Sequence, residues 1–64
     1  MKLKIEERRK SLGYSKAQLA DKVGIHRSNI GRIESGSLTP SLILLDKIAI
    51  ALKTTIDDLI ERED

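Results

Sequence analysis

The chain has 64 residues, with 12 basic and 10 acidic side chains, one aromatic residue, one histidine and no cysteine. This length fits one domain, the absence of cysteine excludes disulfides and zinc–thiolate sites, and no apolar run approaches the roughly 20 residues that span a bilayer. No nucleophile–base pair, carboxylate dyad or phosphate-binding glycine-rich loop indicates an enzyme, so we expect a cytoplasmic, non-enzymatic domain without a cofactor, metal or membrane partner.

Basic and acidic residues are distributed unevenly along the chain. Residues 1–32 hold nine basic and three acidic side chains, a net charge of +6, whereas residues 33–64 hold three basic and seven acidic ones, a net charge of −4. Such asymmetry favours a polyanionic partner for the N-terminal half. A solvated basic surface without a partner is the alternative, and charge alone does not separate the two.

The first two predicted helices cover residues 2–12 and 15–23. The first is short and amphipathic, and it ends at Gly13. The second begins with a capping box, in which the Ser15 hydroxyl accepts from the third helical N–H and the Gln18 side chain reaches back to the cap. The residues expected to be buried in these two helices are Leu3, Ile5, Leu12, Leu19, Ala20 and Val23.

The third predicted helix, residues 27–34, follows a turn at Gly24, where a positive φ allows the chain to reverse. His26 is its weak N-cap, and Gly36 closes it in a left-handed conformation. Two short helices joined around one glycine have the layout of a helix-turn-helix. The side chains expected to fill the angle between the two helices are Val23, Ile25, Ile30 and Ile33.

The last two predicted helices follow a loop over residues 38–41. Ser41 caps the first of them, and Thr55 caps the second, which starts within residues 54–58 and packs Leu59 and Ile60 inward. The expected apolar stripe of the first consists of Leu42, Leu45, Ile48, Ala49 and Leu52. Five short helices without a strand pattern predict an all-α, compact five-helix bundle.

One face of the 27–34 helix is polar. At about 100° per residue, four residues lie opposite the apolar positions Ile30 and Ile33: Arg27, Ser28, Gly31 and Arg32. An arginine fork matches O6 and N7 of guanine in the major groove of DNA. Gly31 leaves room for close approach, although it weakens the helix by up to about 1 kcal/mol relative to alanine. This face is therefore predicted to bind DNA.

Six segments carry a familiar pattern: GYSKAQLA at residues 13–20, VGI at 23–25, IGRIESG at 30–36, TPSL at 39–42, IA at 48–49 and AL at 51–52. In this register the chain resembles the Cro/repressor (XRE-type) helix-turn-helix family over roughly residues 3–61. The resemblance implies a lambda-repressor-like DNA-binding domain over residues 1–64. It further implies a transcriptional regulator, expected to be a repressor or controller protein, that binds double-stranded DNA as a homodimer on a palindromic operator.

The resemblance also implies roles for individual residues. The positions that read base edges are Arg27, Ser28 and Arg32. The positions that contact phosphate are Lys16, Asn29, Ser35, Gly36 and Ser37. Arg9 and Glu34 match a family pair that forms a largely buried salt bridge. Removal of either partner alone would cost about 3–5 kcal/mol of stability.

Three positions depart from the family pattern. Lys16 stands where the commonest residue is glutamine. The lysine keeps a phosphate contact but loses the amide bridge to a base-reading side chain. His26 replaces the usual serine or threonine cap, and it acts as a plain N-cap or as a phosphate contact when protonated. Arg8 stands where many relatives carry leucine, so it either reduces the core or adds a phosphate contact. These departures leave the operator sequence open.

Ile43 and Ile50 lie seven residues apart on the outer flank of the helix that starts at residue 42, where relatives usually carry polar residues. With Ile56, they are expected to form a symmetric dimer seam; scattered surface apolar residues are the alternative. An antitoxin-like protein, or a purely protein-binding helical module, that binds a partner through the same helix is the alternative function. No small-molecule ligand is expected.

Overall fold

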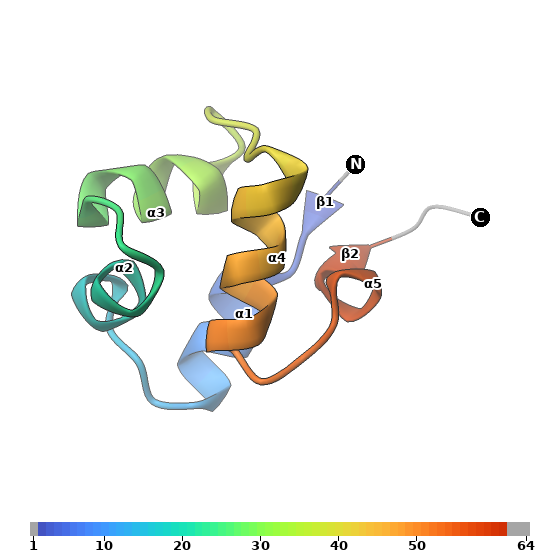
Figure 1. Cartoon of the computed structure of the whole chain (residues 1–64), viewed down its shortest axis with the longest axis horizontal. Coiled ribbons are helices and arrows are strands. Elements are labelled where there is room, and N and C mark those ends of the chain that lie inside the picture. Colours follow the sequence, from blue (N-terminus) through green and yellow to red (C-terminus); the bar gives the residue numbers. More distant parts are fainter. Residues whose placement is uncertain (1, 62–64) are drawn as a thin grey trace.

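Five helices and one short pair of strands make up residues 2–61, the part of the chain that the computed structural model describes (Figure 1). In chain order they are β1 (Lys2–Leu3), α1 (Ile5–Ser11), α2 (Lys16–Val23), α3 (Arg27–Ser35), α4 (Leu42–Ala51), α5 (Ile56–Leu59) and β2 (Ile60–Glu61). The predicted all-α bundle is therefore right in class and in number of helices. None of the helices in this part of the chain has the length and apolar character needed to cross a bilayer.

Side-chain caps start the helices where the sequence predicts them. The Gln18 N–H donates to Ser15 Oγ at 3.0 Å, and the Ser15 N–H donates to Gln18 Oε1 at 2.8 Å, which completes the capping box of α2. The hydroxyls of Ser41 and Thr55 cap α4 and α5 in the same way. Each cap satisfies an otherwise unpaired helical N–H and contributes about 1 kcal/mol.

Two glycines end α2 and α3 in the left-handed region. Gly24 and Gly36 both have φ 86°, a conformation that costs a residue with a Cβ roughly 1–2 kcal/mol. The turn at Gly24 therefore sets the direction in which α3 leaves α2, as the sequence predicts.

The core lies where the helices converge on α4. Figure 1 shows α4 running through the middle of the bundle, where it packs against α2 and α5, while α3 packs on α2. The side chains in the core that are less than 2% exposed are Ile5, Leu19, Ile30, Ile48, Leu52 and Leu59. Full burial of one such side chain contributes about 1.5–3 kcal/mol.

The two ends of the described chain differ from the prediction. Leu3 pairs with Ile60 in an antiparallel β1–β2 ladder, and the Lys4 N–H donates to the Leu59 carbonyl at 2.7 Å. The prediction of a helix from residue 2 was therefore wrong, as was the placement of Ile60 in the last helix. Strand pairing between residues so far apart leaves no local pattern, which is why the sequence did not reveal it.

Leu42 is a second correction. Its side chain is 73% exposed, although its angular position on α4 is close to that of buried Ala49. Because helical side chains lean toward the N-terminus, a residue in the first turn projects beyond the helix end instead of onto the neighbouring helices. The prediction of Leu42 as a core residue was therefore wrong.

Arg8 closes the C-terminal end of α4. Its Nε donates to the Leu52 carbonyl at 3.0 Å and its Nη2 to the Lys53 carbonyl at 3.1 Å. The last carbonyls of a helix lack partners within it, and a cation there is favourable. The structure therefore gives Arg8 a role that differs from both roles expected for it.

Candidate nucleic-acid interface

The angle between α2 and α3 is set by the turn at residues 24–26. The Ala20 carbonyl accepts the N–H groups of Gly24 at 2.8 Å and Ile25 at 3.1 Å. Ala20 itself is buried, with only 3% of its surface exposed, so a larger side chain would push the two helices apart. Ile30 and Ile33 fill the angle from α3. These contacts hold one side of α3 against the bundle and leave the other side uncovered.

The uncovered side of α3 carries the predicted base-reading residues. Arg27, Ser28 and Arg32 are all exposed, and Figure 1 shows α3 along one edge of the bundle. Within residues 2–61 neither guanidinium forms a hydrogen bond or an ion pair. We call these three residues the arginine face, which presents two free cations and a hydroxyl.

Lys16 lies beside the arginine face. A Cβ added to Gly31 would be 3.8 Å from the Lys16 Nζ, so this ammonium lies over the middle of α3 although it belongs to α2. That distance is an ordinary van der Waals contact, so Gly31 is not required by space within the protein. Asn29, also predicted to contact phosphate, is half-buried.

His26 is the N-cap of α3, which was the plainer of its two expected roles. Its Nδ1 accepts the Ser28 N–H at 3.1 Å, and the same nitrogen lies 2.8 Å from Ser28 Oγ. The hydroxyl of Ser28, which is predicted to read a base edge, thus contacts the capping side chain of His26. The sequence analysis did not predict this contact, although the two residues are only two positions apart.

The loop after α3 uses its own donors to close the helix. The Ser37 and Leu38 N–H groups donate to the Arg32 carbonyl at 2.9 and 3.1 Å, and the Gly36 N–H donates back into the last turn at 3.2 Å. The hydroxyls of Ser35 and Ser37 donate to the same carbonyl at 3.1 and 3.3 Å. The predicted phosphate contacts of Ser35, Gly36 and Ser37 therefore compete with these bonds, and a rotatable hydroxyl can change partner more readily than the Gly36 N–H.

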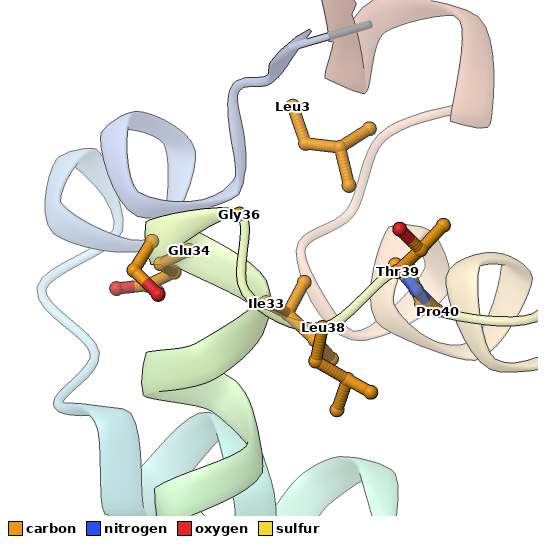
Figure 2. Close-up of a pocket in the computed structure, with 8 residues that line it drawn as sticks. Leu3, Ile33, Glu34, Gly36, Leu38, Thr39 and Pro40 are labelled. Atoms are coloured by element: carbon orange, nitrogen blue, oxygen red, sulfur yellow. The ribbon is translucent and has the colours of Figure 1, made fainter.

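A pocket of about 230 Å³ lies under this loop. Figure 2 shows the side chains of Leu3, Ile33 and Leu38 gathered around it. Its carboxylate, Glu34, is held in an ion pair with Arg9. The pocket lies between β1, the end of α3 and the loop that follows α3, and both polar and apolar residues line it.

Arg9 and Glu34 join α1 to α3 by a bidentate ion pair. Arg9 Nε lies 2.8 Å from Glu34 Oε2 and Nη2 lies 3.2 Å from Oε1, while Nη1 donates to the Tyr14 carbonyl at 2.8 Å. The two side chains are only 8% and 2% exposed. The hydrogen bond to Glu34 raises the pKa of Arg9 above its ordinary value. This pair joins the C-terminal turn of α3 to α1.

The predicted dimer residues lie on and beside α4. Ile43 and Ile50 are 74% and 69% exposed, and Leu42 is 73% exposed next to them. We call these three the α4 apolar surface. Ile56 differs, because it is half-buried and packs against the core, and its place in a dimer seam stays a prediction. The sequence did not assign Leu42 to this surface because its helical angle favours the core.

Known proteins share this arrangement. The family model described as Helix-turn-helix (HTH_3) matches residues 5–59. The chain is 38% identical over 64 residues to YgzD of Bacillus subtilis (strain 168), an uncharacterized HTH-type transcriptional regulator, covering 100% of this chain and 97% of the relative.

Two solved structures are similar at comparable identity. The restriction-modification controller protein C.AhdI from Aeromonas hydrophila has a TM-score of 0.85 and 34% identity, covering 88% of this chain and 85% of that one. SinR, the master regulator for biofilm formation, in complex with DNA has a TM-score of 0.77 and 33% identity, covering 83% of this chain and 86% of that one. The chain therefore belongs to the HTH_3 (XRE-type) helix-turn-helix family of DNA-binding transcriptional regulators.

Proposed function

We propose that this protein binds a palindromic operator in double-stranded DNA as a homodimer and acts as a repressor or controller protein. The observation that carries the proposal is the arginine face on the uncovered side of α3, whose two guanidiniums form no hydrogen bond or ion pair within residues 2–61. The similarity of the chain to a SinR structure solved with DNA supports this use of the face.

In the proposed complex α3 lies in the major groove. Arg27 and Arg32 donate to O6 and N7 of guanines, and Ser28 reads a neighbouring base edge. Lys16, Asn29 and the hydroxyls of Ser35 and Ser37 bind phosphates, which set the position of α3 but carry no sequence information. From Arg27 to Ser35 the helix is about 12 Å long, comparable to the groove width of about 12 Å.

The α4 apolar surface supports a homodimer. Ile43 and Ile50 lie two helical turns apart on one side of α4, and Leu42 extends the surface toward the loop. Three neighbouring, mostly exposed, large apolar side chains on so small a protein favour a partner surface. A two-fold dimer that places its two α3 helices about 34 Å apart would read half-sites one helical turn apart.

The test is selection of bound sequences from a random DNA pool by the purified protein. We expect a palindromic consensus with guanines in each half-site. A consensus without two-fold symmetry would contradict dimeric binding, and recovery of the unselected pool would contradict sequence-specific binding. Arg27→Ala should change the consensus, whereas Lys53→Ala, which removes a cation outside α3, should leave it intact.

The second candidate function is that the α4 apolar surface binds a different protein, as in an antitoxin-like protein or a protein-interaction module. The same three exposed side chains favour it. Sedimentation equilibrium of the purified chain separates the two candidates. A concentration-dependent dimer supports self-association, whereas a monomer throughout the micromolar range, combined with co-purification of a stoichiometric small protein, supports the partner.

A further inference from the structure

The start of α3 contains a chain of hydrogen bonds that ends on the arginine face. His26 Nδ1 accepts the Ser28 backbone N–H at 3.1 Å and lies 2.8 Å from Ser28 Oγ. Both side chains are exposed. The serine hydroxyl therefore meets the histidine on one side while its other side faces solvent together with Arg27 and Arg32.

The backbone N–H fixes the direction of this chain. A backbone amide can only donate, so Nδ1 must present its lone pair and the neutral ring must carry its hydrogen on Nε2. An oxygen 2.8 Å from that lone pair is attracted only if its hydrogen lies between them, so the Ser28 hydroxyl donates to Nδ1. Its hydrogen is thereby used, and only oxygen lone pairs remain for another partner.

We propose that His26 is a positioning residue for sequence specificity, because it makes the Ser28 hydroxyl an acceptor toward DNA. A free serine hydroxyl donates or accepts and so tolerates every base. An acceptor-only hydroxyl selects a base with an amino group in the major groove, adenine N6 or cytosine N4, over one with a keto oxygen, thymine O4 or guanine O6. The inference rests on the proposed function, because it concerns the same face of α3.

The neighbouring side chains make this selection useful. Arg27 and Arg32 can only donate, and they therefore favour bases that present acceptors. If Ser28 accepts while the arginines donate, the arginine face makes two kinds of contact. The order of these donors and acceptors along α3 then specifies the order of keto and amino bases along one DNA strand.

The experiment is selection from a random DNA pool with four proteins. Ser28→Ala identifies the base pair that Ser28 faces, as the position at which preference is lost. At that position the wild-type protein should prefer an amino base over a keto base by about tenfold, the effect of one discriminating hydrogen bond. His26→Gly keeps a residue tolerated at the N-cap but has no side chain to accept the serine hydroxyl, so the preference should fall to about twofold or less on the same hydrogen-bond scale.

His26→Asn is the matched rescue variant. Its side-chain carbonyl caps α3 and can accept the serine hydroxyl, so the amino-base preference should return. A merely structural role would instead lower the affinity for all sequences together and leave the preference at this pair unchanged. Thermal unfolding of each variant establishes that it is folded at the temperature of selection.

A second measurement requires no change at His26. In the selected operator, the adenine facing Ser28 is replaced by purine, which lacks the 6-amino group, or the cytosine by 2-pyrimidinone, which lacks the 4-amino group. Binding of the wild-type protein should weaken about tenfold, and binding of Ser28→Ala should not change.

The outcomes distinguish this inference from the proposed function. Recovery of no consensus by the wild-type protein overturns the proposed function. A palindromic consensus that has a keto base, or no preference, at the position facing Ser28 overturns the inference alone. The inference is likewise overturned if Ser28→Ala retains every preference, or if His26→Gly keeps the full amino-base preference.

Discussion

The outer surfaces of α3 and α4 differ in the chemistry of their exposed side chains. Both helices bury an apolar stripe, Ile30 and Ile33 on α3 and Leu45, Ile48 and Ala49 on α4. The outward residues of α3 include a serine and two arginines that form no ion pair within residues 2–61, whereas α4 exposes three large apolar side chains beside Asp46 and Lys47. A cationic face favours a polyanion and an apolar one favours a protein surface, so one small bundle presents two surfaces for different partners.

The two helices are also held differently. Both helices bury apolar side chains in the core and both have a side-chain N-cap, but within residues 2–61 only α3 is joined to another helix by a buried ion pair, Arg9–Glu34. Because an arginine fork must match its base within a narrow geometry, we expect the position of α3 to be more sensitive to polar substitutions than that of α4.

The largest expected effect is the loss of one partner of the buried ion pair. Arg9→Ala leaves the Glu34 carboxylate buried and unpaired, and it should lower the free energy of unfolding by about 3–5 kcal/mol. Urea denaturation at neutral pH measures this loss. The control is Lys10→Ala, which removes an exposed pair with Glu6 at 2.9 Å and should cost less than about 1 kcal/mol. Similar losses in the two variants would show that α3 is not held by a buried charge pair.

The next effect concerns the α4 apolar surface. Ile43→Glu combined with Ile50→Glu should weaken self-association by at least about 100-fold, because each isoleucine in an interface contributes on the order of 1.5 kcal/mol of burial. Sedimentation equilibrium at micromolar protein measures the change, with Lys47→Gln as a control on the same helix. Self-association that survives the double substitution would place the dimer contact elsewhere.

A smaller effect distinguishes base contacts from phosphate contacts on α3. Arg32→Ala should cost about 1–3 kcal/mol on the selected operator and relax the preference at one base pair, while affinity for random DNA changes little. Competition binding at fixed salt measures both affinities. Lys16→Ala is the contrasting variant, because loss of a phosphate contact should weaken both DNAs alike. Equal losses for Arg32→Ala on the two DNAs would remove it from the base-reading set.

The smallest expected effect is a gain in stability. Gly31→Ala should stabilise the protein by up to about 1 kcal/mol through helix propensity, because the added Cβ meets only the Lys16 ammonium at 3.8 Å. If the glycine provides close approach to DNA, operator binding should weaken in the same variant. Thermal unfolding measures the stability of the variant, and titration with operator DNA measures its affinity. A variant that is more stable and binds DNA normally would leave Gly31 without a functional reason.

Much of the fold was predictable because its determinants are local. The capping box of Ser15 and Gln18, the left-handed Gly24 and the Thr55 cap involve residues at most three positions apart, and the structure contains each of them. The position of Arg27 and Arg32 outside the apolar stripe of Ile30 and Ile33 follows from helical geometry alone. The assignment of these arginines to base edges stays a prediction, since it concerns a partner.

The sequence by itself determined the five helices, the turn between α2 and α3, and the side of α3 that faces outward, because hydrogen bonds and periodicity within a few residues decide them. Only the tertiary structure decided that Leu3 pairs with Ile60, that Arg8 closes α4 from 44 residues away, and that Leu42 lies exposed. The first two are contacts between distant segments, which leave no pattern within either segment, and the exposure of Leu42 depends on where the neighbouring helices lie relative to the end of α4.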